Sequence, residues 1–356
     1  MRKGAKIAGI VIVVVAVVFC VGSYALDRYF LSQTYARMER AGLSLLLTDD
    51  DIAAEHPYTD VQFDLNGNTV RGHVYGAENT RGLIVFRHGI FSHHQDYLAL
   101  ITALVDKGWK VFAYDAIGCG ESDGDSVIGF AQSPLDVRAA VQYACNSGMA
   151  DGMPLLLFGH SWGGYGVAAA LDFPEVRDRV TACVAMSGFD TPNEIINESS
   201  EGRMGPVAAT QKPFIDLIGR MDFGNDANRS ASKAVSECGI PVMIVQGTGD
   251  AVVTAEGSSI YADRADIKNP QVVYVVKSDS GRDGHNTFFY SPESQAYLAE
   301  CTDRLERLQA EYGETLPLDV QAEFLASVDK HRANTADPEL IDQIDGFFQE
   351  AITARK

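Results

Sequence analysis

Short hydrophobic runs alternate with helical segments along most of the chain from residue 58 onward. The later runs are almost continuous in Val, Leu, Ile and Phe, which is typical of strands buried on both faces of a parallel sheet. The first two runs flank Asn66-Gly67-Asn68, a turn sequence that favours a β-hairpin. The runs lie at 61–65, 69–75, 83–87, 110–114, 155–158, 182–186, 242–246 and 272–276, and the helical segments at 97–107, 134–146, 162–171 and 258–264. The pattern predicts an α/β fold with a doubly wound, mostly parallel sheet of eight strands.

The N-terminal segment has a different pattern. Residues 7–26 are 20 positions without a formal charge, and they follow Arg2, Lys3 and Lys6. A helix of this length spans about 30 Å, the thickness of the hydrocarbon core of a bilayer. The positive-inside rule then predicts a single-pass signal anchor in the cell membrane, with residues 1–6 in the cytoplasm and the remaining chain outside. The alternative is a signal peptide cleaved at Ser23-Tyr24-Ala25, which would release a secreted protein.

Other segments also depart from the strand–helix alternation. Residues 27–57 have the pattern of a helical stalk, or of a helix packed on the domain. Residues 190–239 are too long for an ordinary connection, and we expect a cap over the strand ends, with a plain structural insertion as the alternative. A helix over 291–312 is expected to close the sheet and to end a domain of residues 58–312. A helical extension over 313–356 follows, and the start signal Asp337-Pro338-Glu339 opens a helix whose apolar face we expect to pack on the core.

Composition and charge narrow the function classes. Of the 356 residues, 46% are hydrophobic and 22% are charged, as in ordinary globular proteins. The 29 basic and 48 acidic residues give a formal charge of −19, and because three bases precede residue 7, the part beyond the predicted anchor carries −22. Such a surface repels polyanions, so we expect no nucleic-acid partner and favour a neutral or cationic substrate. The six cysteines form no CxxC pair and predict neither a zinc site nor a disulfide framework.

A G-x-S-x-G motif, Gly159-His160-Ser161-Trp162-Gly163, lies directly after the predicted strand 155–158 and opens a segment of small residues. A sharp strand-to-helix turn lifts such a serine hydroxyl out of the sheet. The helix N-terminus also favours the anion of an acyl-transfer intermediate. The motif in this context predicts Ser161 as a nucleophile.

A serine nucleophile needs a base, and the base needs an acid that orients it. Asp250 follows the predicted strand 242–246 and His285 follows the last strand, so the chain order is that of a serine–acid–histidine triad. Asp190, at the end of an earlier strand, is the alternative acid, and Asp283 has the place of a carboxylate that braces a loop. We predict Ser161, Asp250 and His285 as the catalytic residues.

The oxyanion hole of such a site needs two backbone N–H groups. One is expected from Trp162, directly after the nucleophile, and the other from Ile90 in the loop after strand 83–87. His88, His93 and His94 lie in or beside this loop, but the sequence pairs them with no carboxylate at ligand spacing, so no metal is predicted. Gly118-Cys119-Gly120 lacks the third glycine of a dinucleotide fingerprint, so no cofactor is predicted, and Asp115 and Ser122 have the place of turn-bracing residues.

Taken together, these motifs resemble the α/β-hydrolase superfamily over about residues 58–312. The most similar branch is the serine-aminopeptidase and monoacylglycerol-lipase-like group, which has membrane-tethered bacterial members. The resemblance implies the fold and a two-step acyl transfer through an acyl-enzyme, but it implies no particular substrate. The chain departs from the family pattern in two places. The loop after strand 83–87 lacks the H-G-G-G of one esterase class, and the helices beyond about residue 313 lie outside the family core. The matching residues are His88-Gly89, Asp115 with Gly118-x-Gly120-x-Ser122, the Gly159–Gly163 motif, Gly247-x-Gly249-Asp250 and Gly284-His285.

The sequence therefore predicts a membrane-anchored serine hydrolase that cleaves a carboxylic ester of a small acyl compound. A serine peptidase or amidase and an acyltransferase would use the same three residues and are the alternatives among enzymes. A non-catalytic surface module built on the same fold is a more remote alternative. The bilayer, through residues 7–26, is the one macromolecular partner predicted.

Overall fold

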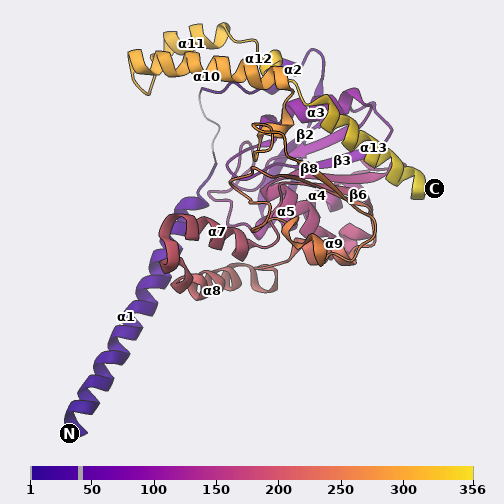
Figure 1. Ribbon diagram of the computed structural model, residues 1–356. Helices are drawn as coiled ribbons and strands as arrows, with labels where there is room; N and C mark the ends of the chain where they lie inside the picture. Colours follow the sequence, from indigo (N-terminus) through magenta and orange to yellow (C-terminus); the bar gives the residue numbers. More distant parts are fainter. Residues whose placement is uncertain (1, 39–42, 356) are drawn as a thin grey trace.

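The structure, a computed structural model, describes residues 2–38 and 43–355 and contains one eight-stranded sheet with helices on both faces (Figure 1). The strand order is β1-β2-β4-β3-β5-β6-β7-β8, and β2 is antiparallel to both of its neighbours while the other pairs are parallel. The predicted fold class and the number of strands are confirmed. The strands are β1 (Tyr58–Leu65), β2 (Asn68–Tyr75), β3 (Leu83–Arg87), β4 (Lys110–Tyr114), β5 (Leu155–His160), β6 (Val180–Met186), β7 (Val242–Gly247) and β8 (Val272–Lys277).

The central strands are buried on both faces because alternate side chains feed two separate cores. Val85 and Leu157 point into one core, which is covered by α4 (Gln132–Asn146), α5 (Trp162–Ala169) and α9 (Ala231–Glu237). Phe86 and Phe158 point into the other core, which is covered by α3 (Leu98–Asp106) and α13 (Pro338–Arg355). The strand period of two explains why these runs are continuous in hydrophobic residues.

The last helix of the chain, α13, covers the sheet, and the expectation that a helix over residues 291–312 would close the sheet is wrong. Only Ser294, Tyr297 and Cys301 are buried on α10 (Pro292–Tyr312), and the latter two belong to a small separate cluster with Ala333. In Figure 1, α10 stands with α11 (Leu318–Ala326) and α12 (Lys330–Ala333) apart from the sheet, whereas α13 lies along it. The apolar face of α13 packs on the core, as its sequence pattern predicted, and seven of its residues are buried.

The first helix, α1 (Arg2–Thr34), leaves the domain as a long rod (Figure 1). Residues 6–34 have a mean hydropathy of 2.7 in their most apolar window, and only 6% of that window is buried. Within the described part of the chain, α1 is the one helix that is long enough and apolar enough to cross a bilayer. Met1 and Lys356, at the ends of the predicted N-terminal and C-terminal segments, lie outside the described residues.

In the described part of the predicted stalk, α1 continues only as far as Thr34 and one short helix follows later. Beyond Thr34 the chain docks on the domain, where Ala36 pairs with Ser126 and Met38 with Cys119. The guanidinium of Arg37 donates hydrogen bonds to the carbonyl oxygens of Gly120, Ser122 and Gly124 at 2.6–2.9 Å. These tertiary bonds replace the helical ones, which explains why the helical pattern of the sequence is not followed. Positions 39–42 of the stalk lie outside the described residues, and α2 (Asp49–Ile52) precedes β1.

The long connection after β6 forms α7 (Pro192–Met204), η3 (Gly205–Thr210), α8 (Lys212–Phe223) and η4 (Gly224–Asp226), which we call the cap. The segment that leaves the core is shorter than the expected 190–239, because α9 packs beside α5 in the sheet layer. Helix α8 lies against α1: the rings of Phe19 and Phe214 are 6.0 Å apart, and Arg28 forms an ion pair with Asp222. The remaining short elements are η1 (His94–Tyr97), η2 (Ala170–Asp172), α6 (Pro174–Arg177), η5 (Ala262–Ala265) and η6 (Thr287–Phe289), so the helix expected at 258–264 is only a 3-10 turn.

Candidate active site

Ser161 lies in the turn between β5 and α5, with backbone angles of φ 56° and ψ −118°. A positive φ is unfavourable for a residue with a side chain, so the surrounding structure must hold it in place. Its own N–H donates to the carbonyl oxygen of Met186 at 2.8 Å. A Cβ added at Gly163 would lie 2.0 Å from the carbonyl oxygen of Arg87, and one added at Gly159 would lie 2.3 Å from that of Gly163. Both flanking glycines are therefore required for the close approach of β3, β5 and α5.

His285 and Asp250 are joined directly. The Nδ1 atom of His285 lies 2.7 Å from Oδ2 of Asp250, and the other oxygen, Oδ1, accepts the N–H groups of Val252 and Val253 at 2.9 Å each. Burial alone would raise the pKa of Asp250, but the hydrogen bond and charge of His285 and these N–H groups outweigh burial and hold the pKa below its usual value. The carboxylate is thus ionised and fixed in orientation.

The other two candidate acids lie elsewhere. Asp190 accepts hydrogen bonds from the hydroxyl of Ser230 at 3.0 Å and from the N–H of Ser232. Both residues lie at the start of α9. Asp283 accepts a hydrogen bond from the hydroxyl of Thr248 at 3.2 Å, the position expected of a loop-bracing carboxylate. Of the three acids, Asp250 is the one in contact with His285.

His160 links Ser161 to His285. The ring centroids of His160 and His285 are 4.7 Å apart, and His160 directly precedes Ser161. Within the described residues, no hydrogen bond joins the hydroxyl of Ser161 to His285. Such bonds are often long before a substrate is bound and tighten in the reacting complex.

The two N–H groups expected to form an oxyanion hole flank the nucleophile. Trp162 is the first residue of α5, and a Cβ added at Gly89 would lie 3.3 Å from Cβ of Ser161, so the loop carrying Ile90 lies against the serine. Neither the N–H of Ile90 nor that of Trp162 donates to another described residue. Both groups can therefore bind a substrate oxygen.

The side chain of Trp162 is fixed by a hydrogen bond and by a guanidinium group packed on its ring. Its indole N–H donates to the carbonyl oxygen of Phe130 at 2.7 Å, and the guanidinium of Arg87 lies 4.2 Å from its ring centroid. Arg87 is fully buried and pairs with Asp136 at 3.3 Å. Burial raises the pKa of Asp136 to about 6, despite the opposing attraction of Arg87.

Tyr97 and His160 connect the loops of the site, a role that the sequence did not reveal. The N–H of Gly89 donates to the hydroxyl of Tyr97 at 3.0 Å, and that hydroxyl lies 2.8 Å from Nδ1 of His160. Nε2 of His160 lies 3.1 Å from the carbonyl oxygen of His285, which can only accept. His160 therefore donates from Nε2, and in the neutral ring Nδ1 accepts the hydroxyl proton of Tyr97. Burial first, and then the charge of His285, lower its pKa, consistent with the neutral form.

Replacing Tyr97 with Phe is expected to lower kcat about tenfold with little change in KM, because the buried N–H of Gly89 and the Nδ1 atom of His160 lose their shared partner. An unpaired buried group costs about 1–3 kcal/mol, so the melting temperature should also fall by several degrees. The matched control is Tyr274→Phe, since that hydroxyl makes one long hydrogen bond to the carbonyl oxygen of Arg264 at 3.5 Å. Equal kcat values for the two variants would contradict a positioning role for Tyr97.

The structure brings carboxylates to two of the loop histidines, which their spacing in the sequence does not pair with any carboxylate. His94 Nδ1 lies 2.7 Å from Oδ1 of Asp115, and His93 Nε2 lies 3.2 Å from Oδ1 of Asp96. Asp115 directly follows β4, and the parallel pairing of β3 with β4 brings it beside the loop that follows β3. As expected, Asp115 also braces a turn, because its Oδ2 accepts the N–H of Glu121 and its carbonyl oxygen accepts the hydroxyl of Ser122.

Comparison with known proteins gives three independent similarities. A profile of the family "Serine aminopeptidase, S33" matches residues 78–209. The uncharacterized protein YfhR of Salmonella typhi is 26% identical over 207 residues, which cover 57% of this chain and 65% of that protein. A monoglyceride lipase homolog of Monkeypox virus is 25% identical over 224 residues, which cover 54% of this chain and 80% of that protein.

Solved structures match over more of the chain. An α/β hydrolase from Vibrio vulnificus has a TM-score of 0.56 at 17% identity, covering 79% of this chain and 93% of its own. The esterase Pf2001 of Pyrococcus furiosus has a TM-score of 0.54 at 18% identity, covering 78% of this chain and 98% of its own. At this identity, the match establishes the fold. Together with the strand order and the placement of the G-x-S-x-G turn, these similarities show that the chain has the α/β-hydrolase fold and that its residues 78–209 are similar to the serine aminopeptidase S33 family.

Proposed function

We propose that the chain is a membrane-anchored serine hydrolase that cleaves carboxylic esters with an apolar acyl group. The observation that carries the proposal is the convergence of Ser161, in a turn with positive φ, with a histidine–aspartate pair and two free N–H groups. These are the parts that acyl transfer requires. The esterase and lipase names of its relatives are consistent with this class of reaction.

In the proposed reaction, Nε2 of His285 takes the proton of Ser161 as its hydroxyl oxygen attacks the ester carbonyl. The N–H groups of Ile90 and Trp162 bind the oxyanion of the tetrahedral intermediate. Asp250 holds the proton on Nδ1 of His285 and stabilises the imidazolium. The alcohol leaves with the proton from Nε2, and water, deprotonated by His285, then cleaves the acyl-enzyme to release the acid.

The contacts of α1 favour a retained anchor over a cleaved signal peptide. Phe19 packs on Phe214, the hydroxyl of Tyr24 lies 3.7 Å from Sδ of Met221, and Arg28 pairs with Asp222. Cleavage at Ser23-Tyr24-Ala25 would remove the first two of these contacts from the cap. With the basic residues at the start of α1 in the cytoplasm, the hydrolase domain lies on the outer side of the membrane.

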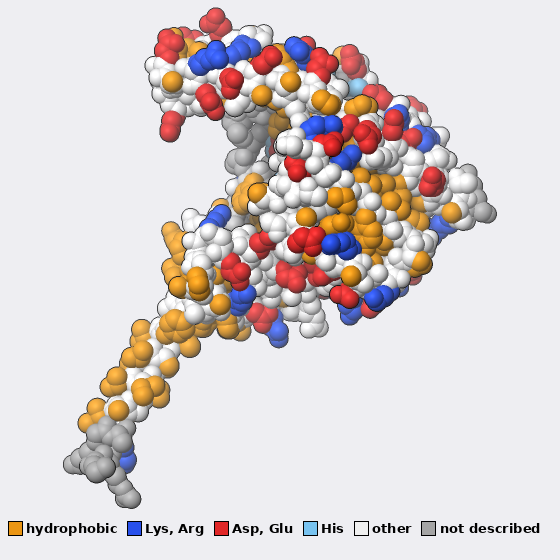
Figure 2. All heavy atoms as spheres, in the orientation of Figure 1, with side chains coloured by type: hydrophobic (Ala, Val, Ile, Leu, Met, Phe, Trp, Pro, Cys, Tyr) orange, Lys and Arg blue, Asp and Glu red, His pale blue; other side chains and the backbone are white. Residues whose placement is uncertain are grey.

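The cap brings further apolar surface to the same end of the molecule. Figure 2 shows hydrophobic side chains along α1 continuing onto the adjoining part of the cap. Met204, Val207, Leu217 and Met221 of the cap are each about half exposed. A surface of this kind adjoining a membrane helix is suited to contact with the acyl chains of lipids.

A cavity of about 350 Å³ lies between the end of α1, the loop 126–131 and the cap. Ile215, Ile218 and Phe223 of the cap are among its mainly apolar lining, and Phe130 connects it to Trp162 through the indole hydrogen bond. Ser161 is not among the described residues that line the cavity, whose link to the nucleophile is the contact between Phe130 and Trp162, the residue after Ser161. We assign it to the acyl group, since a neutral chain suits both this lining and the acidic exterior.

A panel of p-nitrophenyl esters of increasing acyl length, with aminoacyl anilides alongside, tests this assignment on the full chain in detergent. We expect faster turnover of esters than of anilides, and a kcat/KM that rises from acetate to medium-chain esters. Ile215→Trp, which fills the cavity, should remove most of the preference for longer chains, while Leu217→Trp, on an exposed position of the same helix, should keep it.

Faster anilide turnover would favour the peptidase, and acyl transfer to an added alcohol in preference to water would favour the acyltransferase. A folded chain that turns over no substrate would favour the non-catalytic module.

A further inference from the structure

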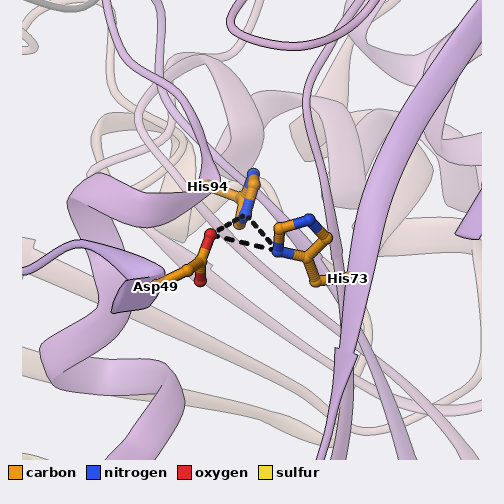
Figure 3. Close-up of side chains that lie close together, drawn as sticks. All are labelled: Asp49, His73 and His94. Atoms are coloured by element: carbon orange, nitrogen blue, oxygen red, sulfur yellow. Dashed lines mark hydrogen bonds and ion pairs between the residues drawn. The ribbon is translucent and has the colours of Figure 1, made fainter. Parts of the chain in front are cut away.

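Outside the proposed active site, three side chains from distant parts of the sequence converge in the interior. Asp49 comes from α2, His73 from β2 and His94 from η1, and all three are at most 5% exposed (Figure 3). His73 Nδ1 lies 3.1 Å from Oδ2 of Asp49 and 3.2 Å from Nε2 of His94, and that Nε2 lies 3.6 Å from the same oxygen. The three atoms therefore form a nearly equilateral triangle.

The size of this triangle matches the coordination shell of zinc. Tetrahedral zinc with bonds of about 2.0–2.1 Å holds its ligand atoms about 3.3 Å apart. A point in the plane of the three observed atoms lies about 1.9 Å from each of them, so an ion slightly out of the plane reaches all three at zinc distances. Oδ2 of Asp49 is buried and has no hydrogen-bond partner among the described residues, although two imidazole nitrogens face it. A buried carboxylate oxygen that accepts no hydrogen bond is costly, and a cation at this point would satisfy it.

The neighbours of the three side chains orient them as the partners of metal ligands do. Nδ1 of His94 is bonded to Asp115 at 2.7 Å, and Nε2 of His73 lies 3.3 Å from Oδ1 of Asp60. The hydroxyl of Tyr75 donates to the other oxygen of Asp49 at 2.5 Å. Each histidine thus has a carboxylate at its outer nitrogen and presents its inner nitrogen to the shared point, an arrangement typical of histidine ligands.

We propose that Asp49, His73 and His94 bind a zinc ion, with the hydroxyl of Tyr75 or a water molecule as the fourth ligand. Two imidazoles and one carboxylate suit zinc better than magnesium or calcium, which prefer oxygen ligands throughout. The ion fastens the segment that follows α1 to the hairpin strand β2 and to the start of η1. It is a structural ion, because the ligands are buried and none of them belongs to the proposed catalytic residues.

The position of His94 gives the ion a second effect. His94 follows Ile90 by four positions along the loop that lies against Ser161. Fixing His94 therefore restrains the loop that carries one of the two proposed oxyanion N–H groups. The bound ion should make this loop less mobile and raise the stability of the docked N-terminal segment.

The test is the metal content of the full chain, purified in detergent without a histidine tag and dialysed after exposure to zinc. We expect about one equivalent of zinc per chain by mass spectrometry, and less than about 0.1 equivalent in His73→Ala and His94→Ala. The matched control is His56→Ala, because the imidazole of His56 pairs with the single carboxylate of Asp106 at 2.8 Å. This variant should keep the full equivalent.

A second measurement keeps the test valid if a variant fails to fold. Wild-type chain stripped of metal and titrated with cobalt should develop the visible absorption of tetrahedral cobalt(II), and added zinc should remove that absorption. Chelation should also lower the melting temperature of the wild type and leave that of a folded His94→Ala variant unchanged. A folded wild type that holds no zinc and shows no cobalt absorption would overturn the proposal, and the cluster would then be a protonated hydrogen-bonded network.

Discussion

Ser161→Ala is expected to abolish ester turnover, with kcat falling by about 10⁶-fold, and to eliminate labelling of the chain by a fluorophosphonate probe. The reason is chemical: without the hydroxyl oxygen there is no acyl-enzyme, and the histidine–aspartate pair has no proton to accept. The fold should be preserved, because only one atom is removed from a site that is already 93% buried by its neighbours, the serine being 7% exposed. Labelling is read on a gel, and the labelled peptide of the wild type is identified by mass spectrometry.

Ser187→Ala is the control for this substitution. Ser187 is also buried, directly follows the neighbouring strand β6, and also has a positive φ, of 43°. Its hydroxyl has no hydrogen-bond partner among the residues that the structure describes. The variant should keep its label and its turnover. Undiminished labelling of Ser161→Ala would refute the assignment of the nucleophile.

Asp250→Asn should lower kcat by about 10⁴-fold while leaving KM nearly unchanged. The surroundings of the side chain determine this result. The position of Oδ1 faces two donors, the N–H groups of Val252 and Val253, so the amide oxygen of Asn must occupy it. The amide nitrogen then occupies the position of Oδ2 and donates to Nδ1 of His285. The imidazole proton is forced onto Nε2, which can no longer accept the proton of Ser161.

The same substitution at Asp190 and at Asp283 provides two controls. Asp190 bonds to Ser230 and Ser232, and Asp283 bonds to Thr248, so neither determines the tautomer of a histidine. We expect both Asn variants to keep kcat within a few-fold of the wild type. A large loss in Asp190→Asn together with a small loss in Asp250→Asn would show that the acid follows β6, as in the alternative considered from the sequence. Steady-state kinetics on one p-nitrophenyl ester is sufficient for the comparison.

The sequence predicted the parts of the molecule whose signals are local. Each of the eight strands contains a short run rich in hydrophobic residues, the runs of β3, β5, β6 and β7 are buried along their whole length, and the G-x-S-x-G turn is five consecutive residues. Asp250 could be chosen because it directly follows a strand, and the structure places it against His285. The three catalytic residues themselves stay a prediction until they are replaced.

What the sequence did not predict depends on contacts between distant segments. Helices α10 and α13 are both amphipathic in sequence, and only packing decides that α13 covers the sheet while α10 stands apart. The helical pattern of residues 35–38 is overridden by strand-like bonds and by the guanidinium of Arg37. His160 could not be assigned a role because its partners, Tyr97 and His285, lie on other loops. Likewise, no spacing rule relates Asp49, His73 and His94.

The packing of α8 on α1 fixes how the proposed enzyme encounters its substrate. If α1 is the anchor that we propose, the cavity that we assign to the acyl group lies beside the membrane surface, because Arg28 and Ser32 of α1 contribute to its lining. A substrate dissolved in the bilayer then arrives by lateral diffusion in two dimensions, and the rate follows its mole fraction among the lipids. Adding inert lipid at a constant amount of substrate slows such a reaction, whereas diluting the vesicles with buffer leaves the turnover of each enzyme molecule unchanged.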